Sequence, residues 1–480
     1  LFTNVATLNA LSAVDIGANI QTNADQNYGS TVNLTADVTL SGNAGSFSGL
    51  ISGNNNDLTL NFTGGQTTIN AAYFSNFLSQ IQNLTSLGPV ELVATTPNPA
   101  LTTAGQQQFE GNVVLGTNVT LQPSDLTING TVEGTTSGNQ SLEVSAVGSV
   151  TFRGNVGQQT RLGNLTLAST SASLRSVSTT GDQEYGSAST SLNGTYDAGG
   201  SDKVVNGTVT LAGNTAIHAA ADVFFAKAIQ GTTDGGQTLV INGSGNTTLG
   251  DTVGTASVAL ASINITGGGQ VTLGGDVTTT GEQQFGEQVV LSADVDFNAT
   301  GGGNITFDGA VDGTAAGSQA LAATTTGNVT FNGTVGGATS LAGINVTGSQ
   351  ITLASNATTA GDQTYSGQLS LNGSYTTGTG NFTQLVGCGT QLAGNTTIDT
   401  GSGNVTLSAT DRAYIAANIA ATGSGNIDID GLRDVTIDGT SGADLSVVNG
   451  NMTLDGHQGV VRNESLRGVR LIQGATLTTT

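Results

Sequence analysis

Apolar and polar residues alternate over short stretches throughout the chain. In one such stretch, Val329 and Phe331 alternate with Asn328 and Thr330. A period of two residues is typical of a strand that is buried on one face, and β-branched side chains fit such a strand. Glycine and asparagine, which tolerate tight corners, separate the stretches. The pattern predicts an all-β fold built from many short strands.

One phrase returns five times and marks a longer repeat. It has the form Gly-Asp/Glu-Gln-x-Tyr/Phe, with variations, and its aromatic residues lie 81, 76, 100 and 80 residues apart. Smaller units, such as Gly303–Val311 and Gly327–Val335, lie 24 residues apart. A chain with these periods stacks one supersecondary unit many times. The five aromatic residues that mark the repeat are Tyr28, Phe109, Tyr185, Phe285 and Tyr365.

These periods predict a right-handed parallel β-helix (β-solenoid) of about 20 coils. The alternative is a string of antiparallel sandwich domains of about 80 residues, but a repeat of roughly 20 to 25 residues is too short for a sandwich and suits one coil. We expect the solenoid to cover residues 1–454, in super-repeats of about 80 to 100 residues, with the recurring aromatic residues stacked inside or capping a wider corner.

The two ends of the chain differ from its middle. The chain starts inside a repeat, at Ala6-Thr7-Leu8, without Met, as a processed form or a part of a longer product would. Residues 455–480 lose the repeat and carry three arginines, so we predict an atypical C-terminal cap or docking segment there. The arginines, Arg462, Arg467 and Arg470, are candidates for an interface with an acidic neighbouring subunit.

A stretch from Ala71 to Gln82 breaks the period of two. Its apolar residues Phe74, Phe77, Leu78 and Ile81 fall on one face of a helix. We therefore predict a short inserted helix near residues 71–82. It would cover a side of the solenoid, or Phe74 and Phe77 would form an apolar docking surface for another subunit.

The charge of the chain disfavours several classes of partner, and its single cysteine excludes an intrachain disulfide. The chain has 10 Lys and Arg against 33 Asp and Glu, a net charge of −23, which disfavours nucleic acid and anionic membranes. No stretch reaches the ~18 apolar residues of a membrane helix, so no membrane insertion is expected. The one cysteine, Cys388, cannot form an intrachain disulfide. It is either a buried, inert thiol or a cross-link between two chains.

Two motifs resemble repeats of large secreted bacterial surface proteins. The phrase Thr-Thr-Gly-Asp/Glu-Gln-x-Tyr/Phe occurs at Thr179–Tyr185 and Thr279–Phe285, and Gly-Asn-Val-Thr-Phe-x-Gly-x-Val-Gly-Gly at Gly327–Gly337. Over about Ala6 to Gly439 the chain is similar to filamentous-haemagglutinin-like and autotransporter-type β-strand-repeat adhesins. The resemblance implies export, a parallel β-helix, and roles in adhesion, biofilm or surface fibres, while the export route stays open.

The sequence offers few groups for catalysis or metal binding. The densest carboxylate group holds Asp428, Asp430, Asp434 and Asp438, with Arg433 among them. Asp428 and Asp430 share one face of a strand, where two carboxylates could hydrolyse a polysaccharide or bind Ca²⁺ weakly. Their positions between Ile427 and Ile429 are equally those that any strand fills with outward polar residues. The two histidines, His218 and His457, are far apart in sequence, so no zinc site is expected.

These observations lead to one main functional expectation and two alternatives. The chain is expected to be an extracellular structural β-solenoid that forms or decorates a bacterial cell-surface fibre by self-association, with neither enzymatic activity nor a cofactor. The first alternative is a monomeric adhesin passenger that binds host or biofilm glycans. The second is a polysaccharide-degrading β-helix enzyme.

Overall fold

A computed structural model shows that the chain is built from strands. It describes residues 5–70, 77–96, 98–200, 202–387, 390–392, 396–410, 412–431, 434–438, 444–456, 468–472 and 476–479. These residues form 56 strands, from β1 (Leu8–Ala10) to β56 (Thr476–Thr479), and contain no helix. Neighbouring strands pair in parallel and stack as a β-solenoid of about 19 turns, which confirms the predicted fold class. The parallel pairing excludes the antiparallel sandwich alternative.

The chain divides into two compact units. The first unit comprises Leu1–Lys227 with Asn242–Gly245, and the second comprises Ala228–Ile241 with Asn246–Thr480. No helix among the described residues is long and apolar enough to cross a membrane.

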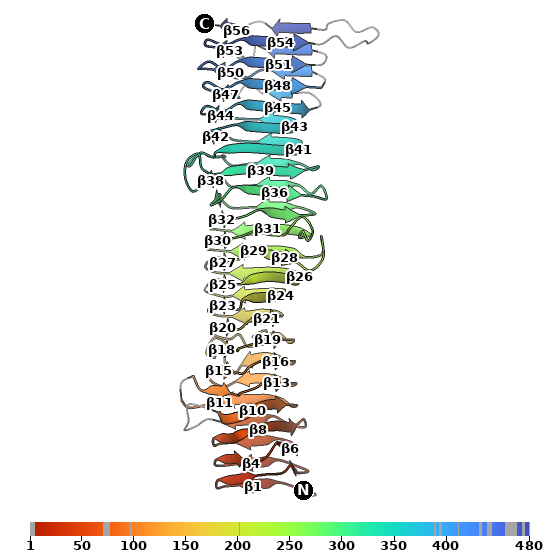
Figure 1. Ribbon diagram of the computed structural model, residues 1–480, viewed down its shortest axis with the longest axis vertical. Coiled ribbons are helices and arrows are strands. Elements are labelled where there is room, and N and C mark those ends of the chain that lie inside the picture. The colour runs from red at the N-terminus through yellow and green to blue at the C-terminus, as the bar shows by residue number, and fades with distance from the viewer. Residues whose placement is uncertain are drawn as a thin grey trace. The chain divides into compact units, whose positions relative to one another are not determined.

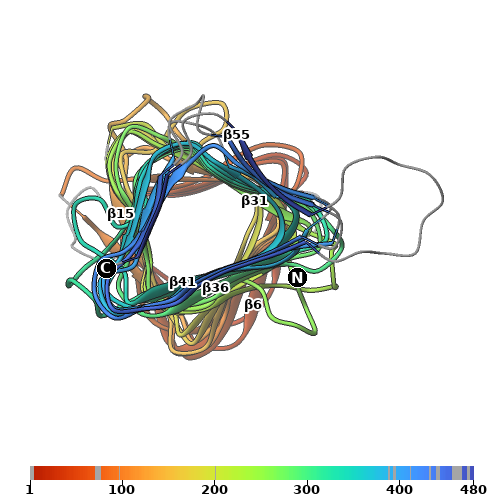
Figure 2. The same cartoon turned by 90° about the horizontal axis from the view of Figure 1, so that it is seen from above.

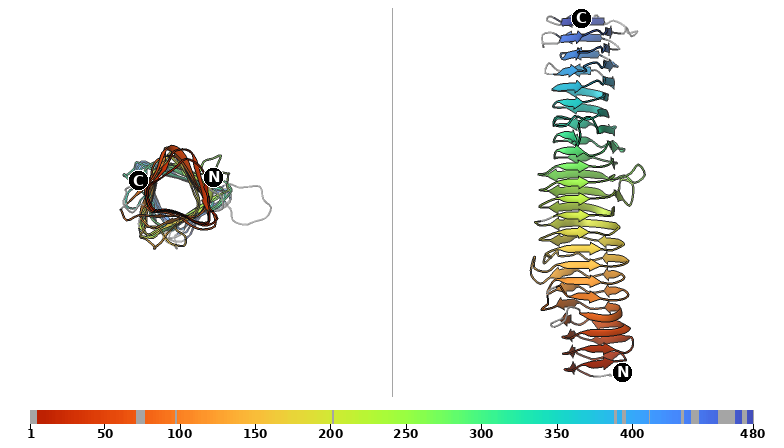
Figure 3. Two further views of the ribbon diagram at one scale, coloured as in Figure 1. Left: turned by 90° about the horizontal axis from the view of Figure 1, so that it is seen from below. Right: turned by 60° about the vertical axis from the view of Figure 1, so that its left-hand side comes forward.

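In the first unit the turns lie one above another, and seen from below the turns nearest the N-terminus have three sides (Figures 1 and 3). One side is a seven-stranded sheet. Its strands, in spatial order, are β1, β4 (Gln26–Tyr28), β7 (Gly45–Phe47), β9 (Thr67–Asn70), β11 (Val90–Val93), β14 (Val113–Leu115) and β17 (Val132–Gly134).

The second unit repeats this construction, and its turns nearest the C-terminus also outline three sides (Figure 2). One side is a six-stranded sheet, in the order β42 (Ala357–Thr359), β44 (Ser374–Thr377), β47 (Thr397–Asp399), β50 (Asn418–Ala421), β53 (Asp444–Val447) and β56. On another side, β34 (Gln283–Phe285) pairs with β37 (Ile305–Phe307), and β37 pairs with β40 (Val329–Phe331).

The register of these strands explains the short repeat. Gln283 lies opposite Ile305, and Ile305 lies opposite Val329, so successive turns take 22 and 24 residues. Inward residues stack on inward residues in the next turn: the rings of Phe285 and Phe307 have centroids 5.3 Å apart, and those of Phe307 and Phe331 are 4.9 Å apart. These rings are buried, as predicted for the interior of the coils.

Asparagines at equivalent corners form a hydrogen-bonded ladder along the second unit. The side-chain oxygen of Asn381 accepts from the backbone N–H of Asn404 at 2.9 Å, and that of Asn404 accepts from the N–H of Asn426 at 2.9 Å. Asn426 accepts in turn from the N–H of Asn451 at 2.8 Å. Each side chain therefore satisfies a backbone donor of the next turn, which explains why asparagine recurs at turn length.

The predicted helix near residues 71–82 is wrong where the structure describes it. Residues 71–76 lie outside the described residues, and Leu78–Ser86 form strand β10, which pairs with β8 (Ile51–Phe62). The strand bulges at Gln80, whose φ is +53°, and its register shifts between Ser79 and Ile81. The extra residue turns both Leu78 and Ile81 inward, which gives apolar residues the three-residue spacing of a helix.

The described part of residues 455–480 continues the parallel ladders. Strand β55 (Gly468–Ile472) pairs with β52 (Asp434–Asp438), and β56 pairs with β53. Arg470 lies on β55, whereas Arg462 and Arg467 lie outside the described residues.

Candidate functional site

The recurring phrase places a glutamine inside the solenoid at each of its five occurrences. The five side chains are at most 1% exposed. In each, the carboxamide nitrogen donates to the backbone carbonyl six residues earlier, across a corner of the turn. The phrase is therefore a structural clamp at a corner rather than a surface motif. We call these sites the glutamine corners of Gln26, Gln107, Gln183, Gln283 and Gln363.

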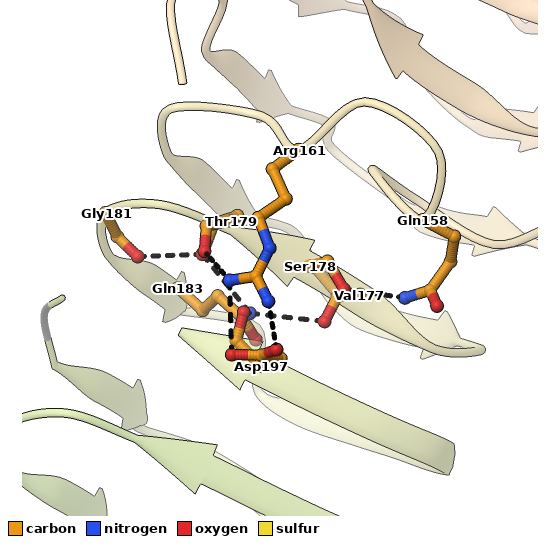
Figure 4. A network of polar contacts seen from close by, with 8 residues as sticks. All are labelled: Gln158, Arg161, Val177, Ser178, Thr179, Gly181, Gln183 and Asp197. Atoms are coloured by element: carbon orange, nitrogen blue, oxygen red, sulfur yellow. Dashed lines mark hydrogen bonds and ion pairs between the residues drawn. The ribbon is translucent and has the colours of Figure 1, made fainter. Parts of the chain in front are cut away.

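The corner of Gln183 ties two successive turns together (Figure 4). Its Nε2 donates to the carbonyl of Val177 at 3.4 Å and to Thr179 Oγ1 at 3.3 Å within its own turn. The same nitrogen donates to the carbonyl of Asp197, in the next turn, at 3.0 Å. Thr179 Oγ1 donates onward to the Gly181 carbonyl at 2.7 Å. The Thr-x-Gly part of the phrase thus closes the corner that the glutamine clamps.

Within the first unit, successive glutamine corners lie on different sides of the solenoid. Gln26 lies on β4 of the seven-stranded sheet. Gln107 lies on β13 (Gln107–Phe109), which pairs with β10 and β16 (Leu126–Ile128). Gln183 lies on β23 (Gln183–Tyr185), in a third sheet with β20 (Leu165–Ala168) and β25 (Lys203–Val205). The corner repeat is therefore not a whole number of turns.

The aromatic residue of the phrase decides whether the side-chain oxygen of the glutamine has a hydrogen-bond donor. The hydroxyls of Tyr28, Tyr185 and Tyr365 donate to the oxygen of the glutamine two residues earlier, at 2.8, 3.1 and 3.1 Å. Phenylalanine replaces tyrosine beside Gln107 and Gln283, and there Oε1 has no hydrogen-bond partner among the described residues. A buried, unsatisfied oxygen costs about 1–3 kcal/mol.

A fully buried lysine distinguishes the Gln183 corner from the others. Lys203 lies directly opposite Gln183 on β25 and is 0% exposed. Its Nζ donates to Gln183 Oε1 at 3.3 Å and lies 3.8 Å and 4.6 Å from the ring centroids of Tyr185 and Tyr196. Burial lowers the pKa of the amine well below its usual value. In the following turn, the residues opposite the other four glutamines are Gly45, Leu126, Ile305 and Phe382.

An ion pair lies on the outside of the same corner (Figure 4). The Arg161 guanidinium forms a bidentate pair with the Asp197 carboxylate and also donates to the Thr179 carbonyl at 3.2 Å. A Cβ at Gly199 would lie 2.6 Å from Arg161 Nη1, so glycine there leaves room for the guanidinium. Both charged side chains are about one-third exposed, at 37% and 31%, so the pair is partly screened by solvent.

A shallow groove of about 260 Å³ beside this pair contains Asp197, His218 and Ser244. Asp197 and His218 lie opposite each other on β24 (Ser189–Ala198) and β26 (Thr208–Ala219). In this part of the chain, which the structure describes, the Asp197 carboxylate pairs with Arg161, and no hydrogen bond joins it to the exposed imidazole. A base that is not oriented by its carboxylate does not activate a serine, so the groove lacks the geometry of a Ser-His-Asp triad.

The structure separates the predicted carboxylate group. Asp428 and Asp430 lie on the outer face of β51 (Ile427–Gly431), where they alternate with the buried Ile427 and Ile429. The register places Asp430 opposite Asp455, while Asp438 on β52 accepts from the Tyr414 hydroxyl. Across the described ranges, no three Asp, Glu, His or Cys residues lie together as metal ligands. Arg433 lies outside those ranges, and Asp434 is placed on β52.

The other candidates fall at scattered positions. Phe77 is 1% exposed and packs into the core, and His218 is exposed on β26. Five candidates lie outside the described residues: Phe74, Cys388, His457, Arg462 and Arg467.

The sequence patterns considered above did not single out Lys203, although its place in an alternating strand indicates that it is buried. It is one of two lysines in the chain, and in Lys203-Val204-Val205 it shares the parity of the buried Val205. The alternation that predicts an inward Val205 also predicts an inward Lys203.

Comparison of the chain with protein-family models, curated proteins and solved structures found no match.

Proposed function

We propose that the chain is an extracellular structural protein that forms or decorates a bacterial cell-surface fibre by self-association. The observation that carries this proposal is the parallel ladder, in which each turn rests its apolar interior on the next, as in the stack of Phe285, Phe307 and Phe331. An edge of such a ladder can accept a strand from another copy of the chain. The resemblance to secreted bacterial adhesin repeats supports the same proposal.

The charge of the chain suggests how copies would recognise each other. A net charge of −23 keeps the separate copies apart in solution and soluble. Residues 455–480 carry three of the arginines, so they are the segment best suited to dock on an acidic neighbour. Arg470 on β55 belongs to this segment.

Electron microscopy and light scattering of the purified full chain test the proposal. We expect fibres or elongated assemblies whose amount rises with protein concentration. Deletion of residues 455–480 should reduce assembly, while a variant with substitutions at Asp428 and Thr453, on the outer face of β51 and its neighbour, serves as a control. Single particles at every concentration would contradict self-association.

A polar groove in the first unit favours the monomeric adhesin as a second candidate. It has a volume of about 260 Å³ and contains side chains of Asn118, Ser141, Glu143 and Asn164. Amide, hydroxyl and carboxylate groups are suited to hydrogen-bonding sugar hydroxyls. A glycan array read together with light scattering separates the two functions, since tight sugar binding without self-association favours the adhesin.

We also propose that the chain is not an enzyme. The support is the outward position of Asp428 and Asp430 on a regular strand whose alternate residues, Ile427 and Ile429, are buried. A reducing-sugar assay on plant and bacterial polysaccharides tests this, with Asp430→Asn as the matched variant. Activity that disappears in Asp430→Asn would overturn the proposal.

A further inference from the structure

The Gln183 corner brings an amine and a carboxamide together out of contact with water. Gln183 and Lys203 are both 0% exposed and lie directly opposite each other in adjacent turns. Nζ lies 3.3 Å from Oε1, and the carbonyl carbon is one bond farther. The amine nitrogen therefore already lies next to the carboxamide group that contains that carbon.

We propose that Lys203 and Gln183 become joined by an amide bond within the folded chain. The Lys203 nitrogen attacks Cδ of Gln183, and the bond from Cδ to Nε2 breaks. The proton that the amine gives up passes to the departing nitrogen, which leaves as ammonia. The product is one secondary amide between two adjacent turns. The step exchanges one amide for another, so it needs neither an oxidant nor a reductant.

The surroundings of Lys203 favour the nucleophilic form of its side chain. Among the described residues, its polar contacts are the Gln183 carboxamide and the rings of Tyr185 and Tyr196. None of these groups is a carboxylate that would hold a proton on the amine. Burial lowers the pKa of Lys203 well below its usual value, which raises the fraction of neutral amine with a free lone pair.

Tyr185 is placed to stabilise the charge that develops during the reaction. Its hydroxyl donates to Gln183 Oε1 at 3.1 Å, and this oxygen becomes negative when the carbonyl carbon turns tetrahedral. Burial raises the pKa of Tyr185 well above its usual value, so the hydroxyl keeps its proton. The carbonyl of Asp197 and Thr179 Oγ1 hold Nε2 and fix the plane of the carboxamide before attack.

The cost of burial also favours the amide product. An amine buried without a charged partner destabilises the fold whenever it takes up a proton. The secondary amide has no titratable group and keeps its hydrogen-bonding atoms inside the corner. The reaction therefore removes the buried basic group of Lys203.

Amine labelling of the unfolded full chain is the direct test. The two lysines are Lys203 and Lys227, and the exposed Lys227 serves as an internal standard. In denaturant we expect reductive methylation to modify Lys227 and leave Lys203 unmodified. Trypsin does not cleave after an acylated lysine, so mass spectrometry should find Ser176–Lys227 as one looped peptide, lighter by one ammonia than the same linear sequence. Equal labelling of both lysines would overturn the proposal.

The role of Tyr185 is tested by the rate at which the bond forms when newly synthesised chain, isolated unfolded and not yet joined, is first folded. Tyr185→Phe removes the hydroxyl and should slow bond formation by about 100-fold, the usual effect of losing one such donor. Tyr365→Phe is the matched control, because its corner has Phe382 where Lys203 would be. Equal rates in the two variants would overturn the role of Tyr185. If Tyr185→Phe fails to fold, labelling of the unaltered chain still decides whether the bond exists.

Discussion

The corner of Gln183 in the first unit and that of Gln283 in the second hold the same clamp in different surroundings. In both, Nε2 donates to two groups of its own turn and to one carbonyl of the next turn. The Gln183 oxygen also accepts from Tyr185 and Lys203. At the other corner Phe285 stands in the place of Tyr185, and the Gln283 oxygen has no partner among the described residues.

This difference shows which polar atom of the glutamine carboxamide the fold requires to be hydrogen-bonded. The nitrogen is satisfied at both corners, because it closes the turn and joins it to the next. The oxygen is without a partner at the two phenylalanine corners, those of Gln107 and Gln283. Phe285 packs at 5.3 Å from both Phe297 and Phe307, and each aromatic pair contributes about 0.5–1.5 kcal/mol beyond its buried area.

The largest expected effect comes from moving the lysine to the apolar corner. Ile305→Lys places an amine opposite Gln283. There, Gln283 Oε1 and the rings of Phe285 and Phe297 would compensate only part of the cost of desolvating the amine. We expect a loss of about 3 kcal/mol in the free energy of unfolding. Denaturant unfolding measures it. Ile305→Met, the matched control, should cost about 1 kcal/mol, and equal stabilities of the two variants would contradict the expectation.

Removing the clamp should cost more where tyrosine accompanies the glutamine. Gln363→Leu leaves the Tyr365 hydroxyl without its acceptor as well as freeing the carbonyls of the corner, so we expect a loss of about 3 kcal/mol. Gln283→Leu also removes an unsatisfied oxygen, so its loss should be about 2 kcal/mol. Unfolding curves of the two variants measured side by side check the order.

The tyrosine corners should make the chain sensitive to alkali. Burial raises the pKa of Tyr365 well above its usual value, whereas in the unfolded chain it is about 10. The unfolded state therefore loses its proton first, and the stabilisation present below pH 10 is lost above it, at about 1.4 kcal/mol per pH unit for each such tyrosine. Tyr365→Phe should flatten this dependence in pH-resolved unfolding, and Phe285→Leu should leave it unchanged.

Adding the missing hydroxyl should stabilise the apolar corner. Phe285→Tyr places a donor two residues from Gln283, as in the corner of Tyr28, whose ring also stacks on a phenylalanine, Phe47, at 5.0 Å. We expect a gain of about 1 kcal/mol. The reciprocal change Tyr28→Phe should lose a similar amount. A loss of stability in Phe285→Tyr would mean that the ring stack leaves no room for the hydroxyl.

The smallest effect is expected at the outer ion pair. Arg161→Met removes the pair with Asp197 but keeps an unbranched side chain over the corner. We expect a loss of about 0.5 kcal/mol, which should decline further at high salt because both partners are partly exposed. Thermal unfolding at low and high salt measures this. A salt-independent loss would point to packing of the arginine stem instead.

Much of the fold could be predicted from the sequence, because alternation fixes which side chains turn inward. Val329 and Phe331 are buried as their period of two indicates, and turn length follows from the spacing of the repeats. The helix prediction failed because the bulge at Gln80 gives Leu78 and Ile81 a helical spacing. Local sequence does not separate these two causes of the same spacing.

The candidate site was harder to predict because it depends on contacts between turns. The phrase around Gln183 was evident as a repeat, but its partner Asp197 contributes a backbone carbonyl, which any residue could supply. Lys203 meets Gln183 only because the turn between them is 20 residues long. A change in that length by one residue would place Lys203 on the outer face.

The stepping of the glutamine corners from side to side has a mechanical consequence. In the first unit, the corners of Gln26, Gln107 and Gln183 stand on three different sheets. The carboxamides of Gln26 and Gln183 each donate to a carbonyl of the next turn, so each joins one pair of adjacent turns. Opening this unit turn by turn must therefore break polar clamps on more than one side of the solenoid.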